Sequence, residues 1–313
     1  MSAFDTIIGQ ELTVARLKRA LGGDRFGHAY LFSGEKGSGK KTLAKAFAKA
    51  LNCESRADND ACGQCLSCRV FESGNHPDTL YIARTKTAGI GVDDVREQII
   101  RPMSMKPFRY RYKIFIVDEA ETMTPAAQNA LLKTIEEPAP YGVFIFLTTD
   151  THAILPTVLS RCAAYKLKPL PDTLVAQVLK QRAVPEDSAR LCAAFARGNI
   201  GRALALAESE ELAELRGLAE EITKKMPRMN IVEALNFYPS FLKWKESVQT
   251  LLEMLYLCYH DAVLAQPAPS KAYFQGLEAI TRAQKILRQN GNFQLTIEVL
   301  LLELLPIKEQ QSI

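Results

Sequence analysis

The sequence predicts an α/β fold with a parallel sheet in its first half and an all-helical second half. Up to about residue 165, short apolar runs alternate with amphipathic segments of helical spacing, the pattern of a parallel sheet covered by helices. A glycine-rich turn joins the first of these strands to a helix, and a later apolar strand ends in two adjacent carboxylates. From residue 172 onward the apolar residues recur at helical spacing.

The glycine-rich turn, GEKGSGKKT at 34–42, predicts a phosphate-binding loop. An apolar strand at 28–33 precedes it and a helix at 43–51 follows, so backbone N–H groups and the helix dipole would face a phosphate. Lys40 holds the position of the lysine that meets the outer phosphates. The nucleotide-binding residues expected from this motif are Gly34, Gly37, Gly39, Lys40, Lys41 and Thr42.

One position departs from the phosphate-loop pattern. The usual Ser or Thr, whose hydroxyl ligates Mg²⁺, is replaced by Lys41, and an ammonium has no lone pair to offer a metal. Thr42 lies one residue on, roughly 100° around the helix axis, and is not expected to take over the ligand position. The loop therefore predicts nucleotide binding with weak or no hydrolysis; a turn that only caps a helix is the alternative.

Two more strands end in polar residues that would reach the same nucleotide. The run KIFIVDEAE at 113–121 places Asp118 to hold Mg²⁺ through water and Glu119 to polarise the attacking water. The run VFIFLTTD at 143–150 places Thr149 where it could sense the terminal phosphate. An ordinary strand end is the alternative interpretation of Thr149.

Four clustered cysteines predict a metal site. Their spacing is C-x8-C-x2-C-x2-C, and four thiolates at such separations can enclose a tetrahedral structural zinc that leaves no open coordination position. A disulfide or redox role is the alternative. The predicted ligands are Cys53, Cys62, Cys65 and Cys68, whereas the scattered cysteines are interpreted as buried apolar residues: Cys162, Cys192 and Cys258.

Composition and charge fit a cytoplasmic protein of two or three domains. The chain has 313 residues, 47% hydrophobic and 24% charged, with a net charge of +4, which neither demands nor excludes nucleic acid. It shows no signal peptide and no long uncharged apolar stretch, so we expect no membrane association. The basic stretch of Lys106, Arg109, Arg111 and Lys113 is interpreted as a solvated loop, with a phosphate-facing patch as the alternative.

These motifs, with FDTIIGQE at 4–11, QNALLKTIEEP at 128–138 and SRC at 160–162, resemble the clamp-loader subunits of bacterial DNA polymerase III, of the AAA+ class. Within that family the sequence is most similar to the delta-prime subunits, the stators of the loader. The resemblance implies three domains: an AAA+ nucleotide-binding domain at 1–166 with a zinc insertion at about 53–68, a helical lid at 167–207 and a helical collar at 208–313.

The resemblance also implies the function. Such a subunit works in a heteropentamer with other clamp-loader subunits, which opens the sliding clamp and places it on primer-template DNA. The arginine of the Ser-Arg-Cys triplet, Arg161, would reach into the nucleotide site of a neighbouring subunit and act in trans. From the residues alone, an arginine at a helix end is more often a solvated charge.

A second departure supports a stator. Gly201 stands where hydrolysing clamp-loader subunits carry an arginine that contacts their own nucleotide, and Arg202 lies one residue beyond. The cofactors implied are structural Zn²⁺ and ATP with Mg²⁺, the latter impaired by Lys41. The alternatives are a motor-type clamp-loader subunit that hydrolyses ATP, a zinc-containing P-loop nucleotide kinase, and a scaffold that binds no nucleotide. Such kinases usually carry two separate C-x2-C pairs.

Overall fold

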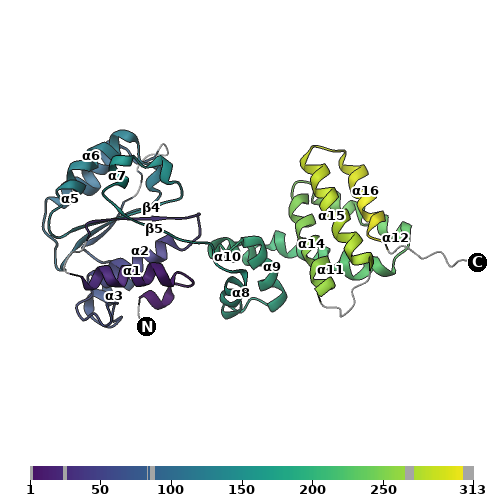
Figure 1. Ribbon diagram of the computed structural model, residues 1–313, viewed down its shortest axis with the longest axis horizontal. Coiled ribbons are helices and arrows are strands. Elements are labelled where there is room, and N and C mark those ends of the chain that lie inside the picture. Colours follow the sequence, from purple (N-terminus) through teal and green to yellow (C-terminus); the bar gives the residue numbers. More distant parts are fainter. Residues whose placement is uncertain (1–2, 24–26, 83, 85–88, 265–270, 306–313) are drawn as a thin grey trace, which may run out of the picture. The chain divides into compact units, whose positions relative to one another are not determined.

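The computed structural model describes residues 3–23, 27–82, 84, 89–264 and 271–305 (Figure 1). By its internal contacts the chain divides into two compact units. The first comprises residues 1–178 and 196–203, and the second comprises residues 179–195 and 204–313. The first unit contains the sheet, and the second is helical.

The first unit is built on a five-stranded sheet in the order β2-β3-β4-β1-β5, in which every pairing is parallel. Strands β1, β3 and β4 are buried at every residue, as their continuous apolar sequences predict for central parallel strands. The strands are β1 Ala29–Ser33, β2 Thr79–Ile82, β3 Lys113–Val117, β4 Gly142–Thr148 and β5 Ala163–Lys166.

Helices cover both faces of the sheet, so the first unit has three layers (Figure 1). Alternate residues of β1 face opposite layers: Tyr30 and Phe32 pack with the layer of α1 to α3, and Leu31 packs with the layer of α4 to α7. The first layer contains α1 Glu11–Gly22, α2 Lys40–Leu51 and α3 Leu66–Glu72. The second contains α4 Val92–Val95, α5 Arg101–Met103, α6 Pro125–Glu136 and α7 Pro156–Leu159.

Short helical turns complete this unit. Three are 3-10 turns, and the π-helical turn η2 lies between α4 and α5. They are η1 Phe4–Thr6, η2 Arg96–Ile100, η3 Ala120–Thr122 and η4 Thr151–Ala153. Because all strands run parallel, the carboxyl ends of β1, β3 and β4 meet at one edge, and ligands of open α/β sheets bind there.

Lys113 corrects the prediction of a solvated basic loop at 106–113. It begins β3 and is only 7% exposed. Its ammonium donates to the carbonyl oxygens of Pro102 and Met105, both at 2.9 Å. These two acceptors explain why a lysine tolerates burial here, whereas Arg109 and Arg111 are exposed as predicted.

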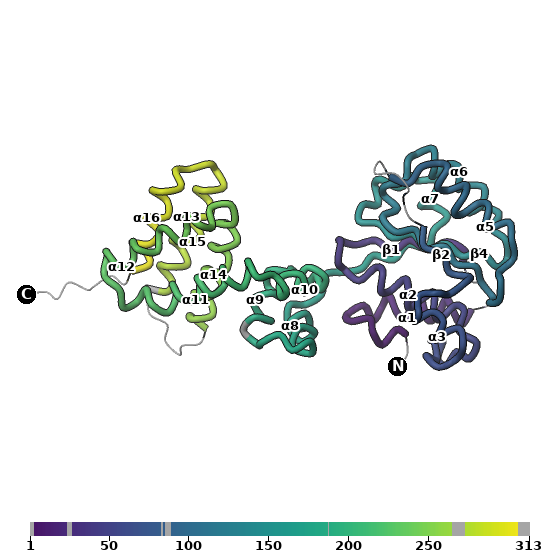
Figure 2. The backbone as a smooth tube through the Cα atoms, turned by 180° about the vertical axis from the view of Figure 1, so that it is seen from behind, coloured from purple at the N-terminus to yellow at the C-terminus, as the bar shows by residue number. Residues whose placement is uncertain are grey.

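The second unit is a helical bundle with its own core. In it α11 packs on α14, α14 on α15 and α15 on α16, and Figure 2 shows α14 and α15 side by side. Fully buried side chains at its centre include Phe241, Leu251, Leu255, Ile280 and Leu301. Most of α8 and the start of α10 belong to the first unit, and the other helices from 172 onward to the second. These helices are α8 Asp172–Gln181, α9 Glu186–Ala196, α10 Ile200–Glu208, α11 Glu210–Lys225, α12 Ile231–Leu235, α13 Tyr238–Lys243, α14 Val248–Leu264, α15 Lys271–Arg288 and α16 Phe293–Glu303, with the 3-10 turn η5 Met226–Arg228 after α11.

Among the described residues, none of the helices combines the length and the apolar character needed to cross a lipid bilayer.

Candidate nucleotide site and metal cluster

The predicted phosphate loop connects β1 to α2 at the carboxyl edge of the sheet. Gly37 and Gly39 have φ angles of +87° and +93°, in the left-handed region that side chains other than glycine rarely adopt. Gly39 is the N-cap of α2 and contributes no side-chain cap, so the first-turn N–H groups of that helix remain available to an anion. The sequence therefore forms the expected anion cradle.

Lys40 is folded into the loop. The residue is only 8% exposed, and its ammonium donates to the carbonyl oxygens of Gly34 at 2.7 Å and Glu35 at 2.8 Å. Burial lowers the pKa of Lys40, although the negative charges of nearby carboxylates, mainly Glu121 and Asp118, act to raise it. The lysine that should meet the outer phosphates is thus held by the loop's own carbonyl groups.

Lys41 forms an ion pair with Asp118, the carboxylate predicted to hold Mg²⁺. The ammonium nitrogen lies 2.5 Å from Oδ2 of Asp118, with side-chain exposures of 62% for the lysine and 35% for the aspartate. The substitution seen in the sequence therefore does more than remove a hydroxyl ligand. It places a positive charge on the carboxylate that would otherwise face the metal.

Glu119 follows directly and has an unusual backbone. Its φ and ψ are +50° and +45°, a left-handed conformation that costs a non-glycine residue about 1 kcal/mol or more. Its carbonyl accepts the N–H and the hydroxyl of Thr122, both at 2.8 Å, which fixes this turn after β3. The Glu119 side chain is exposed and lines the cavity in front of the phosphate loop.

Thr149 is paired with a carboxylate that the sequence analysis did not include in the site. Its hydroxyl donates to Oε1 of Glu121 at 2.6 Å. Burial raises the pKa of Glu121, but hydrogen bonds, led by that from the Thr149 hydroxyl, outweigh this effect and lower the pKa. The signal was present in the sequence, since Glu121 follows Asp118-Glu119 by two residues on the same turn.

One cavity gathers nearly all the predicted nucleotide residues. It is lined by Gly37, Gly39, Lys40, Lys41, Thr42, Asp118, Glu119 and Thr149, together with Glu35, Lys36, Glu121 and Leu147. Gly34 is not in its lining but accepts the Lys40 ammonium. The structure thus brings the three strand ends together as predicted.

Arg161 lies outside the lining of this cavity. It follows α7, and one of its guanidinium nitrogens lies 2.7 Å from Oε1 of Glu136, at the end of α6. Another donates to the carbonyl of Thr157 at 2.8 Å and to the Ser160 hydroxyl at 3.2 Å. With 37% of its side chain exposed, Arg161 is a surface arginine held in place by one exposed carboxylate.

The four predicted metal ligands meet in one cluster. Their sulfur atoms all lie within 4.8 Å of one another, and those of Cys53 and Cys65 are 3.9 Å apart. Four sulfurs at the usual Zn–S distance of about 2.3 Å form a tetrahedron with edges of about 3.8 Å, so the residues fit a zinc ion. Cys53, Cys62, Cys65 and Cys68 would hold it.

Backbone N–H groups point at three of these sulfurs, a pattern suited to thiolates. Cys62 accepts from the N–H groups of Gln64 and Cys65, which lower the pKa of its thiol to about 6. Burial raises the pKa of Cys53 and Cys68. The scattered cysteines, predicted to be buried, are only partly buried: Cys162, Cys192 and Cys258. Their partial burial still raises the pKa of the Cys162 thiol to about 12 and that of the Cys258 thiol to about 11, as expected of unreactive thiols.

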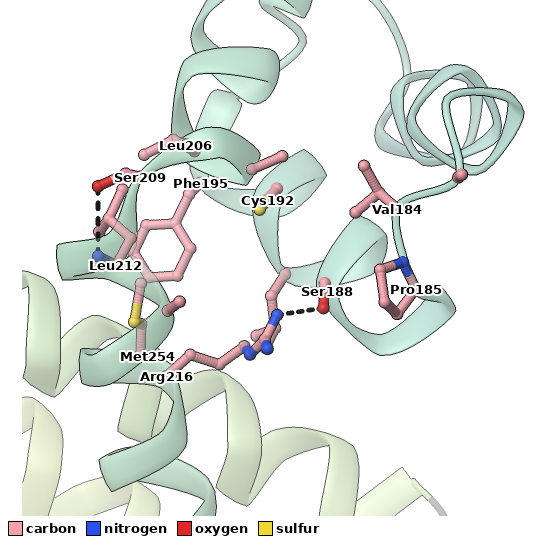
Figure 3. A pocket seen from close by; sticks show the side chains of 14 residues that line it. Val184, Pro185, Ser188, Cys192, Phe195, Leu206, Ser209, Leu212, Arg216 and Met254 are labelled. Atoms are coloured by element: carbon pink, nitrogen blue, oxygen red, sulfur yellow. Dashed lines mark hydrogen bonds between the residues drawn. The ribbon is translucent and has the colours of Figure 1, made fainter.

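A second cavity lies in the helical unit (Figure 3). Its lining is mostly apolar and comes from α9, the residues just before it, the end of α10, α11 and Met254 of α14. The one charged side chain in it, Arg216, donates to the hydroxyl of Ser188 and lies 3.5 Å from a carboxylate oxygen of Glu220. Burial raises the pKa of the Cys192 thiol in this cavity.

The strand–loop–helix unit, the carboxylates after β3 and the helix-covered parallel sheet define a P-loop ATPase fold of the AAA+ class. Residues 9–171, more than half of the chain, match the family model described as DNA polymerase III, delta subunit. The chain belongs to this family of DNA polymerase III subunits.

Curated relatives agree. The gamma subunit of DNA polymerase III from Buchnera aphidicola is 30% identical over 95% of this chain and 89% of its own length. The tau subunit from Bacillus subtilis is 31% identical over 90% of this chain but only 53% of its own length, and the tau/gamma subunit from Haemophilus influenzae is 38% identical over 66% and 30%. The chain thus spans about half, or less, of several relatives it matches.

Among solved structures, a DNA polymerase III gamma subunit-related protein from Thermotoga maritima aligns with 93% of this chain and 98% of its own, at 20% identity and a TM-score of 0.47.

Proposed function

We propose that this chain is a delta-prime-type clamp-loader subunit, a stator with weak or no ATP hydrolysis of its own. It would assemble with other clamp-loader subunits into a heteropentamer that loads the sliding clamp onto primer-template DNA. The observation that carries the proposal is the ion pair between Lys41 and Asp118. A motor needs a metal ion beside that carboxylate, and this chain provides a lysine ammonium instead.

The surroundings of the cavity support the same proposal. Lys40 is engaged with the carbonyls of Gly34 and Glu35, and the Thr149 hydroxyl is engaged with Glu121. Groups that would contact the outer phosphates in a motor subunit therefore already have partners within the chain. ATP with Mg²⁺ is the cofactor that the fold would accept, and we expect its binding to be weak.

Arg161 is proposed to act on the nucleotide of a neighbouring subunit. It lies outside the lining of its own chain's cavity, is partly exposed, and is held by a single carboxylate, that of Glu136. A guanidinium supplied in trans stabilises the charge that develops on a transferring phosphoryl group. The chain would then contribute this arginine and its architecture to the complex.

The metal cluster is proposed to be a structural zinc site formed by Cys53, Cys62, Cys65 and Cys68. The three-domain division, with boundaries after residues 166 and 207, remains part of the proposal. In it the helices from residue 208 onward form a collar that joins the subunits. The exposed apolar side chains on α16 support such a role, because Leu295 is 61% and Val299 is 42% exposed.

A motor-type subunit is the second candidate, because the curated relatives that match over most of this chain are tau and gamma subunits. A nucleotide kinase is no longer a candidate function, since the chain belongs to the family of DNA polymerase III subunits.

The first test is the ATPase rate of the purified chain, measured beside its ATP affinity by calorimetry with and without Mg²⁺. We expect negligible turnover and an affinity that Mg²⁺ does not raise. Turnover at a rate typical of a motor would replace the stator with the second candidate. Absence of turnover with no measurable affinity would leave an architectural subunit that uses no nucleotide of its own.

A further inference from the structure

The tip of the phosphate loop contacts another part of the first unit, the start of α10. The N–H of Gly201 donates to the carbonyl of Gly37 at 2.9 Å. The side-chain amide of Asn199 donates to the carbonyl of Lys36 at 2.7 Å and lies 3.4 Å from a carboxylate oxygen of Glu35. Asn199 is only 5% exposed, so this contact is a packed one.

Two glycines allow the backbones to approach this closely. A Cβ atom on Gly201 would lie 2.6 Å from the Cα of Gly37 and 2.8 Å from its carbonyl oxygen. A Cβ atom on Gly37 would lie 2.6 Å from Oδ1 of Asn199 and 3.2 Å from the Cα of Gly201. The obstacles are mainly backbone atoms, which cannot rotate away as a side chain can. The absence of an arginine at position 201 is therefore a requirement of this contact.

Asn199 serves both partners at once. Its Oδ1 accepts the N–H of Arg202 at 3.0 Å, which caps the first turn of α10, while its Nδ2 holds the loop. First-turn N–H groups have no acceptor within their own helix, and here the N–H of Gly201 finds one in the loop. The start of α10 and the loop tip thus complete each other's hydrogen bonds.

The turn before α10 is fixed at its other end as well. Gly198 accepts the N–H of Leu170 at 2.9 Å, and a Cβ atom on Gly198 would lie 2.4 Å from the Leu170 carbonyl oxygen. The residue two before Leu170, Lys168, exchanges hydrogen bonds with the side chain of Gln10 at 2.7 and 3.3 Å. The segment 198–201 is therefore held between residue 170 and the phosphate loop.

From this geometry we infer that the phosphate loop of this chain is a socket for the start of α10, closed without nucleotide, with Asn199 as its positioning residue. The contact uses the carbonyl groups of Gly37 and Lys36, and so does not require a phosphate on the N–H groups of the loop. The inference deepens the proposed stator function, on which it rests in part: a subunit that does not cycle through nucleotide states would keep this contact closed permanently.

Hydrogen exchange of the full chain without nucleotide tests the socket. The amide of Gly201 should exchange slowly although it lies in a first helical turn. Asn199→Asp keeps an oxygen to cap Arg202 but loses the donor to Lys36, so exchange in residues 34–42 should become about fivefold faster while residues 200–206 keep their protection. Asn199→Ala should accelerate exchange in both segments.

Ser209→Ala is the matched control, because Ser209 caps α11 through Leu212 and does not contact the loop. It should leave exchange in 34–42 unchanged. Unprotected Gly201 in the wild-type chain, or an unchanged loop in Asn199→Asp, would refute the socket. A more than tenfold slowing of exchange in 199–203 on adding Mg²⁺ and ATP would also refute it, since nucleotide would then close the contact. ATP turnover by itself would overturn only the stator proposal.

Discussion

Replacing Lys41 by threonine tests the charge argument most directly. The Lys41 ammonium lies 2.5 Å from Oδ2 of Asp118. A Mg²⁺ ion held through water by that carboxylate would lie about 5 Å from the ammonium nitrogen. A single and a double positive charge at that distance repel by about 1.7 kcal/mol in a water-like dielectric and by about 7 kcal/mol at an effective dielectric of 20. Lys41 is 62% exposed, so the lower value applies.

We therefore expect Lys41→Thr to tighten Mg²⁺-dependent ATP binding by at least about 15-fold, as removal of about 1.7 kcal/mol of repulsion implies. Calorimetric titration with ATP, with Mg²⁺ and with EDTA, measures this change. Lys41→Met is the matched control, because it removes the charge and adds no hydroxyl ligand. It should recover the part of the gain that is due to repulsion, and the threonine variant should exceed it.

Equal ATP affinity in the wild-type chain and both variants would refute the reasoning. The ion pair with Asp118 would then have no influence on the metal, and the cause of weak binding would lie elsewhere in the cavity. An equal gain in both variants would show that repulsion acts alone, without a contribution from hydroxyl coordination.

Three other outcomes are expected. In the assembled complex, Arg161→Ala should lower the ATPase rate at the nucleotide site that it reaches by about 10³-fold while Glu136→Ala does not lower it, and an unaltered rate in Arg161→Ala would exclude the finger. Cys65→Ser should abolish stoichiometric zinc in a colorimetric assay and lower the free energy of unfolding by more than about 3 kcal/mol, whereas Cys192→Ser should retain the zinc. His76 is 6% exposed, and its two ring nitrogens hydrogen-bond the hydroxyls of Ser67 and Thr79. This burial lowers the pKa of His76, so the stability it confers is complete above the unfolded-state pKa of about 6.5 and is lost, by up to about 1.4 kcal/mol per pH unit, as pH falls below that value. Urea midpoints of His76→Gln at pH 7.5 and 5.5 should lack this dependence.

The strand ends of the site were predictable because each depends on a local pattern. Buried parallel strands are continuous apolar runs, so β1, β3 and β4 could be recognised, and parallel pairing brings their carboxyl ends to one edge. The cysteine cluster was predictable for the same reason, since its four members lie within 16 residues of one another in the sequence.

The partners of these residues could not be predicted, because they depend on distances between segments far apart in the sequence. The sequence showed that Lys41 could not bind a metal, but its pairing with Asp118 requires the spacing of β1 and β3 across β4. Likewise, Gly201 was recognised as a departure from the family pattern, and only the backbone of Gly37 explains why a side chain is excluded there. Lys113 was misassigned because its two carbonyl acceptors lie 8 and 11 residues away.

The ion pairs of Lys41 with Asp118 and of Arg161 with Glu136 differ in which charged group remains available to a ligand. Lys41 forms an ion pair with the carboxylate that a metal would need, and the buried Lys40 donates to a loop carbonyl. Both cations of the motif therefore have partners within the chain's own site. Arg161 is paired with the carboxylate of Glu136 and also donates to the Thr157 carbonyl and the Ser160 hydroxyl. The side chains of Arg161 and Glu136 are 37% and 45% exposed, and such surface ion pairs contribute about 0.2 to 1 kcal/mol. A neighbouring subunit's phosphate would compete with that carboxylate at little cost, because bidentate binding to phosphate is among the stronger interactions of a guanidinium. Under the proposed function, the same chain would therefore have both lysines of its own site engaged and still offer one arginine to a partner.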